Sequence, residues 1–117
     1  MKTRIYPAPA LGGRYELQPM ETVSLHGAQS AQIGMVRIGA GTRSPAEGLR
    51  AGAQHEIAYL VSGRVRVDTA DGSRVVEAGS VIISSPTEAH ATTALSDATI
   101  MYVQIDPATF ALPGPAL

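Results

Sequence analysis

The sequence predicts an all-β sandwich or barrel, and three observations support that fold class. Short apolar segments recur at intervals of roughly eight to twelve residues, separated by Gly, Pro and Asp-Gly. No segment repeats its apolar residues at helical spacing over three turns. Near the middle of the chain, Asp71-Gly72 separates two alternating segments, as expected for a β-hairpin.

Length, charge and cysteine content limit what the chain can be. Its 117 residues make one domain, and a formal net charge of −1 gives no electrostatic footprint for nucleic acid or a membrane surface. Cysteine is absent, which excludes disulfides, thiolate nucleophiles and Cys-ligated zinc. No apolar run follows the charged start, so we expect no signal peptide and a soluble, cytoplasmic protein.

Composition divides the chain into three parts. Residues 1–20 form an N-terminal lead-in whose Pro and Gly residues prevent a long helix, so irregular structure or short edge strands are predicted. Residues 21–106 form the predicted β-barrel. Residues 107–117 form a tail containing Pro113-Gly-Pro115, which is predicted to be loosely ordered unless it packs on a partner.

The first half of the barrel is organised around one apolar strand. Shorter strands are predicted at residues 21–25 and 31–38, followed by a loop at 39–52 that is rich in Gly, Pro, Ser and Ala. The organising strand, Ile57 to Val61, is apolar at both parities. A strand with one wet face would alternate, so this strand is predicted to be covered on both sides, in a two-sheet barrel or at a dimer interface.

The second half begins with the hairpin. Residues 64–70 and 73–77 are its strands, and Asp71-Gly72 supplies the positive-φ residues that a tight primed turn demands. Three further segments are predicted to complete the barrel. They are a short buried strand at 81–83, a polar turn at 84–90, and a strand at 99–105 that we expect to be covered on both faces.

Two half-motifs in this region resemble the cupin superfamily. Glu56, six residues and Gly63 are similar to the latter half of the first cupin motif, G-x5-H-x-H-x3,4-E-x6-G. Gly79, ten residues and His90 are similar to the second, G-x5-P-x-G-x2-H-x3-N. The resemblance spans about residues 50–95 and implies a small single-domain cupin with a double-stranded β-helix, the jelly-roll barrel.

The chain departs from the cupin pattern at the metal ligands. The two motif-one histidines would fall at Arg50 and Gly52, or at Leu49 and Ala51 with the other spacing. The terminal Asn of motif two is Ala94. Both motif-one histidines, which are two of the four usual metal ligands, are therefore missing, and the metal-binding motif is degenerate.

The remaining donors are too few for a tight metal site. Glu56 and His90 carry over from the resemblance, whereas a catalytic divalent metal takes three or four protein donors. Gln54 has the right parity but a weakly ligating amide, and His55 could reach the same metal only through a β-bulge. We therefore expect no cofactor, with a divalent iron, manganese, nickel or zinc site as the alternative.

Without a metal, strand alternation predicts an inward set of Arg50, Gln54, Glu56 and His90. Glu56 and His90 can act as a general acid and base, and Arg50 can hold a carboxylate or enolate oxygen through a charge-assisted hydrogen bond. A lumen-facing Tyr102 can donate a hydrogen bond to a ligand. The predicted catalytic residues are therefore Glu56 and His90, and the predicted substrate-binding residues are Arg50, Gln54 and Tyr102.

Several functions stay open at this point. The first is a small cupin that binds a small organic acid or ketone and moves a proton, as an isomerase, lyase or cyclase. The second is a non-catalytic cupin, either a metabolite-binding shell or a structural subunit in which Glu56 and His90 satisfy buried polarity. The third is a metal-dependent dioxygenase.

The expected partners are a small-molecule ligand and a second copy of the chain. Strands apolar at both parities in so short a chain leave surface that one copy does not bury, so a homodimer is predicted, packed through sheet faces or exchanged edge strands. His26 has no companion donors in sequence and is predicted to lie at an edge or interface rather than to bind a metal.

Overall fold

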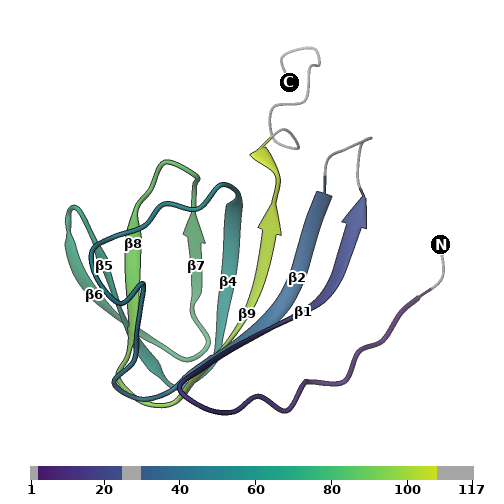
Figure 1. Cartoon of the computed structure of the whole chain (residues 1–117), viewed down its shortest axis with the longest axis horizontal. Helices are drawn as coiled ribbons and strands as arrows, with labels where there is room; N and C mark the ends of the chain where they lie inside the picture. Colours follow the sequence, from purple (N-terminus) through teal and green to yellow (C-terminus); the bar gives the residue numbers. More distant parts are fainter. Residues whose placement is uncertain (1–2, 25–29, 108–117) are drawn as a thin grey trace.

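The computed structural model describes residues 3–24 and 30–107, which form two antiparallel β-sheets facing each other (Figure 1). The strands are β1 (Tyr15–Ser24), β2 (Ser30–Ile38), β3 (Arg43–Ser44), β4 (His55–Ser62), β5 (Arg64–Thr69), β6 (Gly72–Glu77), β7 (Val81–Ser84), β8 (His90–Ala94) and β9 (Ala98–Ile105). One sheet has five strands in the order β1-β2-β9-β4-β7, and the other has four in the order β3-β8-β5-β6. Within the described ranges, no helix is long and apolar enough to cross a membrane. The predicted all-β jelly-roll architecture is confirmed.

Strand register sorts the side chains of the five-stranded sheet into an inner and an outer face. Directly opposed residues on neighbouring strands share a face, and successive residues alternate. Leu60 on β4 is opposed by Ile100 on β9, which is opposed in turn by Val36 on β2. These three side chains are buried, and Leu60 is 0% exposed. The even-numbered residues of β2, β4 and β9 therefore face the interior.

The core lies between the two sheets. Val65 on β5, also 0% exposed, reaches it from the four-stranded sheet. The buried apolar cluster comprises Val36, Ile38, Ala58, Leu60, Val65, Ala94, Ala98, Ile100 and Tyr102. Burial of such side chains is worth roughly 1.5–3 kcal/mol for each large aliphatic residue. The middle of the barrel is filled by this cluster, which leaves the space for a ligand nearer one end.

Gly34 makes room for the largest of these side chains. A Cβ at Gly34 would lie 2.4 Å from the Tyr102 hydroxyl oxygen and 2.6 Å from its Cζ atom. Gly34 opposes Tyr102 on the neighbouring strand. The absence of a side chain on β2 therefore allows the Tyr102 ring to lie flat against that strand.

Most predicted strands are confirmed, including those that became β2, β4, β5, β6 and β9. The hairpin turn is not of the primed type, because Gly72 has a φ of 132° and no non-glycine residue in the described ranges has a positive φ. Thr69 instead holds the turn, since its hydroxyl accepts a hydrogen bond from the Asp71 amide at 3.2 Å.

Three strands that were predicted to be buried or covered on both faces expose apolar side chains in the single chain; on β9, Met101 is 38% exposed. The strand at 81–83 became β7, an edge strand rather than a buried one, with Val81 56% and Ile83 71% exposed. The organising strand became β4, yet Ile57 and Tyr59 on its outer face are more than a third exposed. The outer face of β4 is therefore uncovered within one chain, and the other alternative, a dimer interface on that face, stays a prediction.

Two strands differ from the sequence prediction: β1 begins earlier than predicted, and β8 was not predicted. β1 begins at Tyr15, within the predicted lead-in, and continues past Pro19 with a bulge, which is tolerated because β1 is an edge strand. β8 was not predicted, because His90–Ala94 contains only small or polar side chains. His26 and most of the predicted tail lie outside the described residues.

Candidate functional site

A cavity of about 280 Å³ lies between the sheets, beside the apolar core. It is lined from both sheets and from the segment that joins β3 to β4. The lining residues are Tyr15, Leu17, Val36, Ile38, Ser44, Pro45, Arg50, Gly52, Glu56, Ala58, Ile82, Ser84, His90, Thr92, Ile100, Tyr102 and Gln104. Its floor is therefore apolar, and its polar groups gather around Glu56 and His90.

Glu56 belongs to a polar row that crosses the inner face of the five-stranded sheet. It is opposed by Ser84 on β7 and by Gln104 on β9. The next row inward, formed by Ile82, Ala58 and Tyr102, is mainly apolar. Glu56 is half-buried. The alternation of β4 thus places one carboxylate at the boundary between the core and the open end of the cavity.

His90 enters from the opposite sheet, and Arg50, in the segment between β3 and β4, is tied to it through the backbone. The amide of each donates a hydrogen bond to the carbonyl of the other, both at 3.1 Å. The His90 Nδ1 atom lies 3.4 Å from the backbone oxygen of Glu88. A carbonyl oxygen only accepts, so this contact favours a proton on Nδ1 and leaves Nε2 as the basic nitrogen.

Tyr102 is the most buried polar group in the cavity wall, at 2% exposed. Its hydroxyl donates a hydrogen bond to the Gln32 side-chain oxygen at 3.1 Å. Burial raises the pKa of Tyr102 above its usual value, and the negative charge of Glu56 adds to that shift. The phenol therefore stays protonated and available as a donor across the neutral pH range.

The structure brings together four of the residues that the sequence singled out: Arg50, Glu56, His90 and Tyr102. Gln54 lies just before β4 and does not line the cavity, since strand alternation begins only at the following residue. The polar lining residues that were not proposed as site residues include Ser84 and Gln104. Gln104 shares the parity of Tyr102 on the same strand, so this signal was present in the sequence.

His55 does not join the cavity. It is the neighbour of Glu56 on β4 and is opposed by Ile105, which places it in the outward row. No bulge interrupts the register between His55 and Leu60, so the irregularity that could turn both side chains to one point is missing there.

The donor set does not fit a resident divalent metal. Within residues 3–24 and 30–107, no three His, Cys, Asp or Glu side chains are grouped closely enough to hold one. Glu56 and His90 supply two donors to the cavity, and the residues that oppose Glu56 on the neighbouring strands are the neutral Ser84 and Gln104. Iron, manganese, nickel and zinc sites in proteins usually take three or four imidazole, thiolate or carboxylate donors. We therefore assign no step of the chemistry to a metal.

A larger and more open cleft of about 730 Å³ lies between the edge strands β6 and β7. Val67, Val76 and Ile82 form much of its floor, and Asp71, Arg74 and Glu77 stand on its wall. Among the residues that the structure describes, no histidine or tyrosine lines it. Paired acid and base groups converge in the smaller cavity, so the candidate site is placed there.

Comparison with known proteins supports the fold. No protein family matches the sequence, and no curated protein matches it significantly. Solved structures do match. An RmlC-like cupin from Shewanella frigidimarina is 13% identical, with a TM-score of 0.63 over 88% of this chain and 86% of the other. A cupin superfamily protein from Desulfitobacterium hafniense is 9% identical, with a TM-score of 0.66 over 84% and 83%.

KdgF from Halomonas is also similar, at 15% identity and a TM-score of 0.64, over 92% of this chain and 94% of that protein. At identities this low, the structural likeness establishes the arrangement of the strands alone, whereas the chemistry of each cavity depends on its own residues. The nine strands, their order in two sheets and these likenesses agree with one another. The chain has the fold of a small cupin.

Proposed function

We propose that the chain binds a small organic acid or ketone in the cavity between its sheets and transfers a proton at the carbon next to the carbonyl. The observation that carries this proposal is that Glu56 from one sheet, His90 from the other, and Arg50 from the segment between β3 and β4 all line one small cavity. Neither sheet alone supplies both an acid and a base.

Each polar group has a role that its chemistry supports. The Glu56 carboxylate takes the proton from the carbon, and a doubly protonated His90 donates its Nε2 proton to the oxygen of the resulting enolate. The reverse transfers return a proton to the carbon from Glu56 and a proton to His90 from the enol oxygen. Arg50 binds a carboxylate of the substrate, because a guanidinium donates charge-assisted hydrogen bonds and remains protonated. The protonated Tyr102 phenol can redirect its hydrogen bond from Gln32 to the substrate oxygen.

The size of the cavity limits the substrate. A volume of about 280 Å³ is at the lower end of small-molecule sites, which begin near ~300 Å³. Val36, Ala58, Ile82 and Ile100 supply an apolar wall for a short carbon chain. A compact acid or ketone therefore fits better than a nucleotide or a sugar chain. The reactions that such a proton transfer serves are isomerisation, elimination and cyclisation.

Exchange of solvent deuterium into substrate carbon tests the proposal. Pyruvate, 2-oxobutyrate and acetone would be incubated with the protein in deuterium oxide, and the loss of the α-proton signals followed by NMR. The expected result is catalysed exchange that falls by about 10²–10⁴-fold in Glu56→Gln, the range of a positioned base. Glu77→Gln, on the outer face of β6, is the matched control and should keep the wild-type rate.

Two outcomes would contradict the proposal. Exchange at the background rate with every probe, together with measurable binding of one of them, would make the chain a binding protein rather than an enzyme. Exchange that survives Glu56→Gln unchanged would remove the carboxylate from the mechanism. A folded Glu56→Gln variant, checked by circular dichroism, is required for the comparison.

A further inference from the structure

The larger cleft between β6 and β7 has no part in the proposed proton transfer. It lies between one edge strand of each sheet, since β6 and β7 each pair with a single neighbour. Its volume of about 730 Å³ falls within the range of roughly 300–1,000 Å³ that small-molecule sites occupy. The cleft and the candidate site share one lining residue, Ile82. The two spaces therefore meet only at that side chain.

The floor of the cleft is apolar. Val76 on β6 is opposed by Val65, which is 0% exposed, so Val76 faces the interior. Ile82 on β7 is opposed by the buried Ala58 and also faces inward. Val67, Val76 and Ile82 are half-buried and pack against the core cluster. The cleft thus presents an apolar surface that a short hydrocarbon chain can cover.

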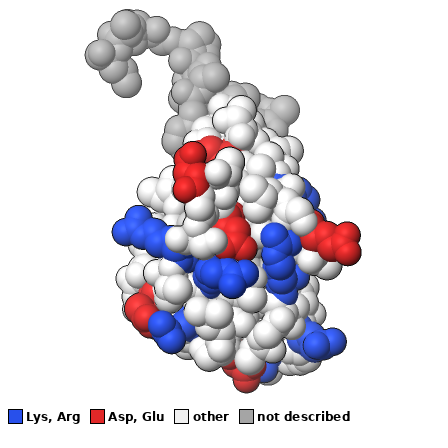
Figure 2. Space-filling model, turned by 90° about the vertical axis from the view of Figure 1, so that its left-hand side faces the viewer, with Lys and Arg blue, Asp and Glu red and all other residues white. Residues whose placement is uncertain are grey.

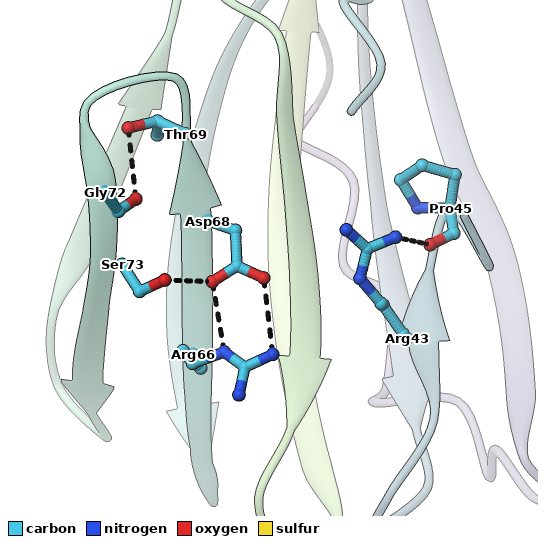
Figure 3. A network of polar contacts seen from close by, with 7 residues as sticks. All are labelled: Arg43, Pro45, Arg66, Asp68, Thr69, Gly72 and Ser73. Carbon is cyan, nitrogen blue, oxygen red and sulfur yellow. Dashed lines mark hydrogen bonds and ion pairs between the residues drawn. The ribbon is translucent and has the colours of Figure 1, made fainter. Parts of the chain in front are cut away.

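The β5–β6 hairpin carries three arginines, and two of them are paired with carboxylates on the outer face. Arg66 donates hydrogen bonds to Asp68 at 3.0 and 3.3 Å (Figure 3). Arg64 pairs with Glu77 at 2.8 Å. Figure 2 shows acidic and basic side chains spread across this side of the molecule. The outer cations of the hairpin therefore have partners within the hairpin itself.

Arg74, the third arginine, lies on the inner side of β6. It is opposed by Val67, whose side chain packs against the core, and it lines the cleft. Among residues 3–24 and 30–107, no hydrogen bond or ion pair involves its side chain. A guanidinium carries five N–H donors in a fork that matches the two oxygens of a carboxylate. Arg74 thus places an unpaired cation beside the apolar floor.

We infer that the cleft between β6 and β7 binds a small monocarboxylate with an apolar chain, of the kind found in medium-length fatty acids. The carboxylate pairs with Arg74, and the chain covers the apolar floor. Two acids limit the charge of the ligand, since Asp71, in the turn of the hairpin, and Glu77 also line the cleft. These acids repel a multiply charged anion such as a phosphate more strongly than a single carboxylate.

The inference does not rest on the proposed function. Neither Glu56 nor His90 lines the cleft, and the candidate site is less than half as large. A compact acid therefore suits the candidate site, whereas an acid with a longer chain suits the cleft. Because the cleft is tested by binding and the proposed function by exchange, the failure of one leaves the other standing.

The first test is calorimetric titration of the full chain with hexanoate, octanoate and decanoate. Each added pair of methylenes should lower the dissociation constant by about threefold to fifteenfold, the upper value being that of complete burial. Arg74→Gln should raise it by about threefold to tenfold, because a charge-assisted hydrogen bond is lost at a solvent-accessible position. Asp71→Asn should lower it by about twofold, because a repelling charge is removed.

Two arginine variants locate the carboxylate. Arg14→Gln is the matched control, since Arg14 is exposed and lines neither space, and it should keep the wild-type affinity. Arg50→Gln reports on the candidate site, which Arg50 lines. Binding that weakens in Arg50→Gln and not in Arg74→Gln would place the carboxylate in the candidate site and overturn the inference. Circular dichroism confirms that each variant is folded.

The second test follows the isoleucine and valine methyl groups by NMR during the decanoate titration. Ile82 and Ile83 are neighbours on β7 and point to opposite faces, with Ile83 71% exposed on the outside. The inference predicts shifts at Ile82 and Val76 and none at Ile83. Non-specific adhesion to exposed apolar surface would shift Ile83 first.

Three results would overturn the inference. One is no saturable binding of decanoate up to about 10 mM, beyond the roughly millimolar affinity expected of a ligand this small. Another is a shift at Ile83 without one at Val76, which would place the chain on the outer face of the five-stranded sheet. The third is shifts at Ile82 and Ile100 without Val76, which would place it in the candidate site.

Discussion

Replacing Gly63 with alanine should destabilise the fold more than the same change at Gly79. Both glycines have left-handed backbone conformations, with φ of 88° and 92°. An alanine in this region costs roughly 1–2 kcal/mol at either position. The two sites differ in what the new Cβ meets. At Gly63 it would lie 2.3 Å from the Asp97 backbone oxygen and 2.8 Å from the Ala98 Cα atom, whereas at Gly79 nothing lies within 4 Å.

The clash at Gly63 involves backbone atoms at the start of β9, so no side chain can rotate away to relieve it. Overpacking of this kind costs about 1–3 kcal/mol. Gly63→Ala should therefore lower the free energy of unfolding by roughly 2–5 kcal/mol, and Gly79→Ala by the backbone contribution of roughly 1–2 kcal/mol alone. Chemical denaturation followed by circular dichroism measures both. The two variants are compared at one protein concentration, so that the predicted association would contribute equally to each. Equal losses in the two variants would refute the reasoning.

Two further predictions concern single polar contacts. Tyr102→Phe removes the hydrogen bond to Gln32 and should lower the free energy of unfolding by about 1–3 kcal/mol, the cost of leaving a partner unsatisfied; an unchanged denaturation midpoint would show that the bond contributes nothing. Hydrogen bonds from Ser73 and then Arg66 hold the pKa of Asp68 below its usual 3.8, so the stabilisation is present above that pH and is lost as the pH falls through the folded-state pKa. Asp68→Asn should therefore flatten the decline of stability below about pH 4 relative to the wild type, as followed by thermal unfolding at a series of pH values; identical acid limbs would contradict this.

The strands with large apolar residues were predictable from the sequence, and β8 was not. The alternation in β5, the apolar run of β9 and the Asp-Gly turn signal are local properties of the chain. β8 consists of His, Ala and Thr, and it is a strand because β5 and β3 hydrogen-bond to it. That pairing is a tertiary effect, which local propensity does not contain.

The candidate site was partly predictable for the same reason. Glu56 and His90 stood at motif positions, and strand parity correctly indicated that Tyr102 faces inward. Strand parity also predicted that Gln54 faces inward, but Gln54 does not line the cavity, because alternation applies only within a strand and β4 begins one residue later. The partnership of Glu56 with Ser84 follows from the pairing of β4 with β7, which no local pattern specifies.

The most direct test of the account is whether Glu56 and His90 act on one substrate as a pair. The measurement is the rate constant for deuterium exchange in the wild type, Glu56→Gln, His90→Gln and the double variant, with the best probe of the set. Residues that act as a unit are strongly non-additive. We predict that the double variant loses no more than the worse single variant, within about threefold. Losses that multiply, or a His90→Gln variant with the wild-type rate, would contradict a shared site.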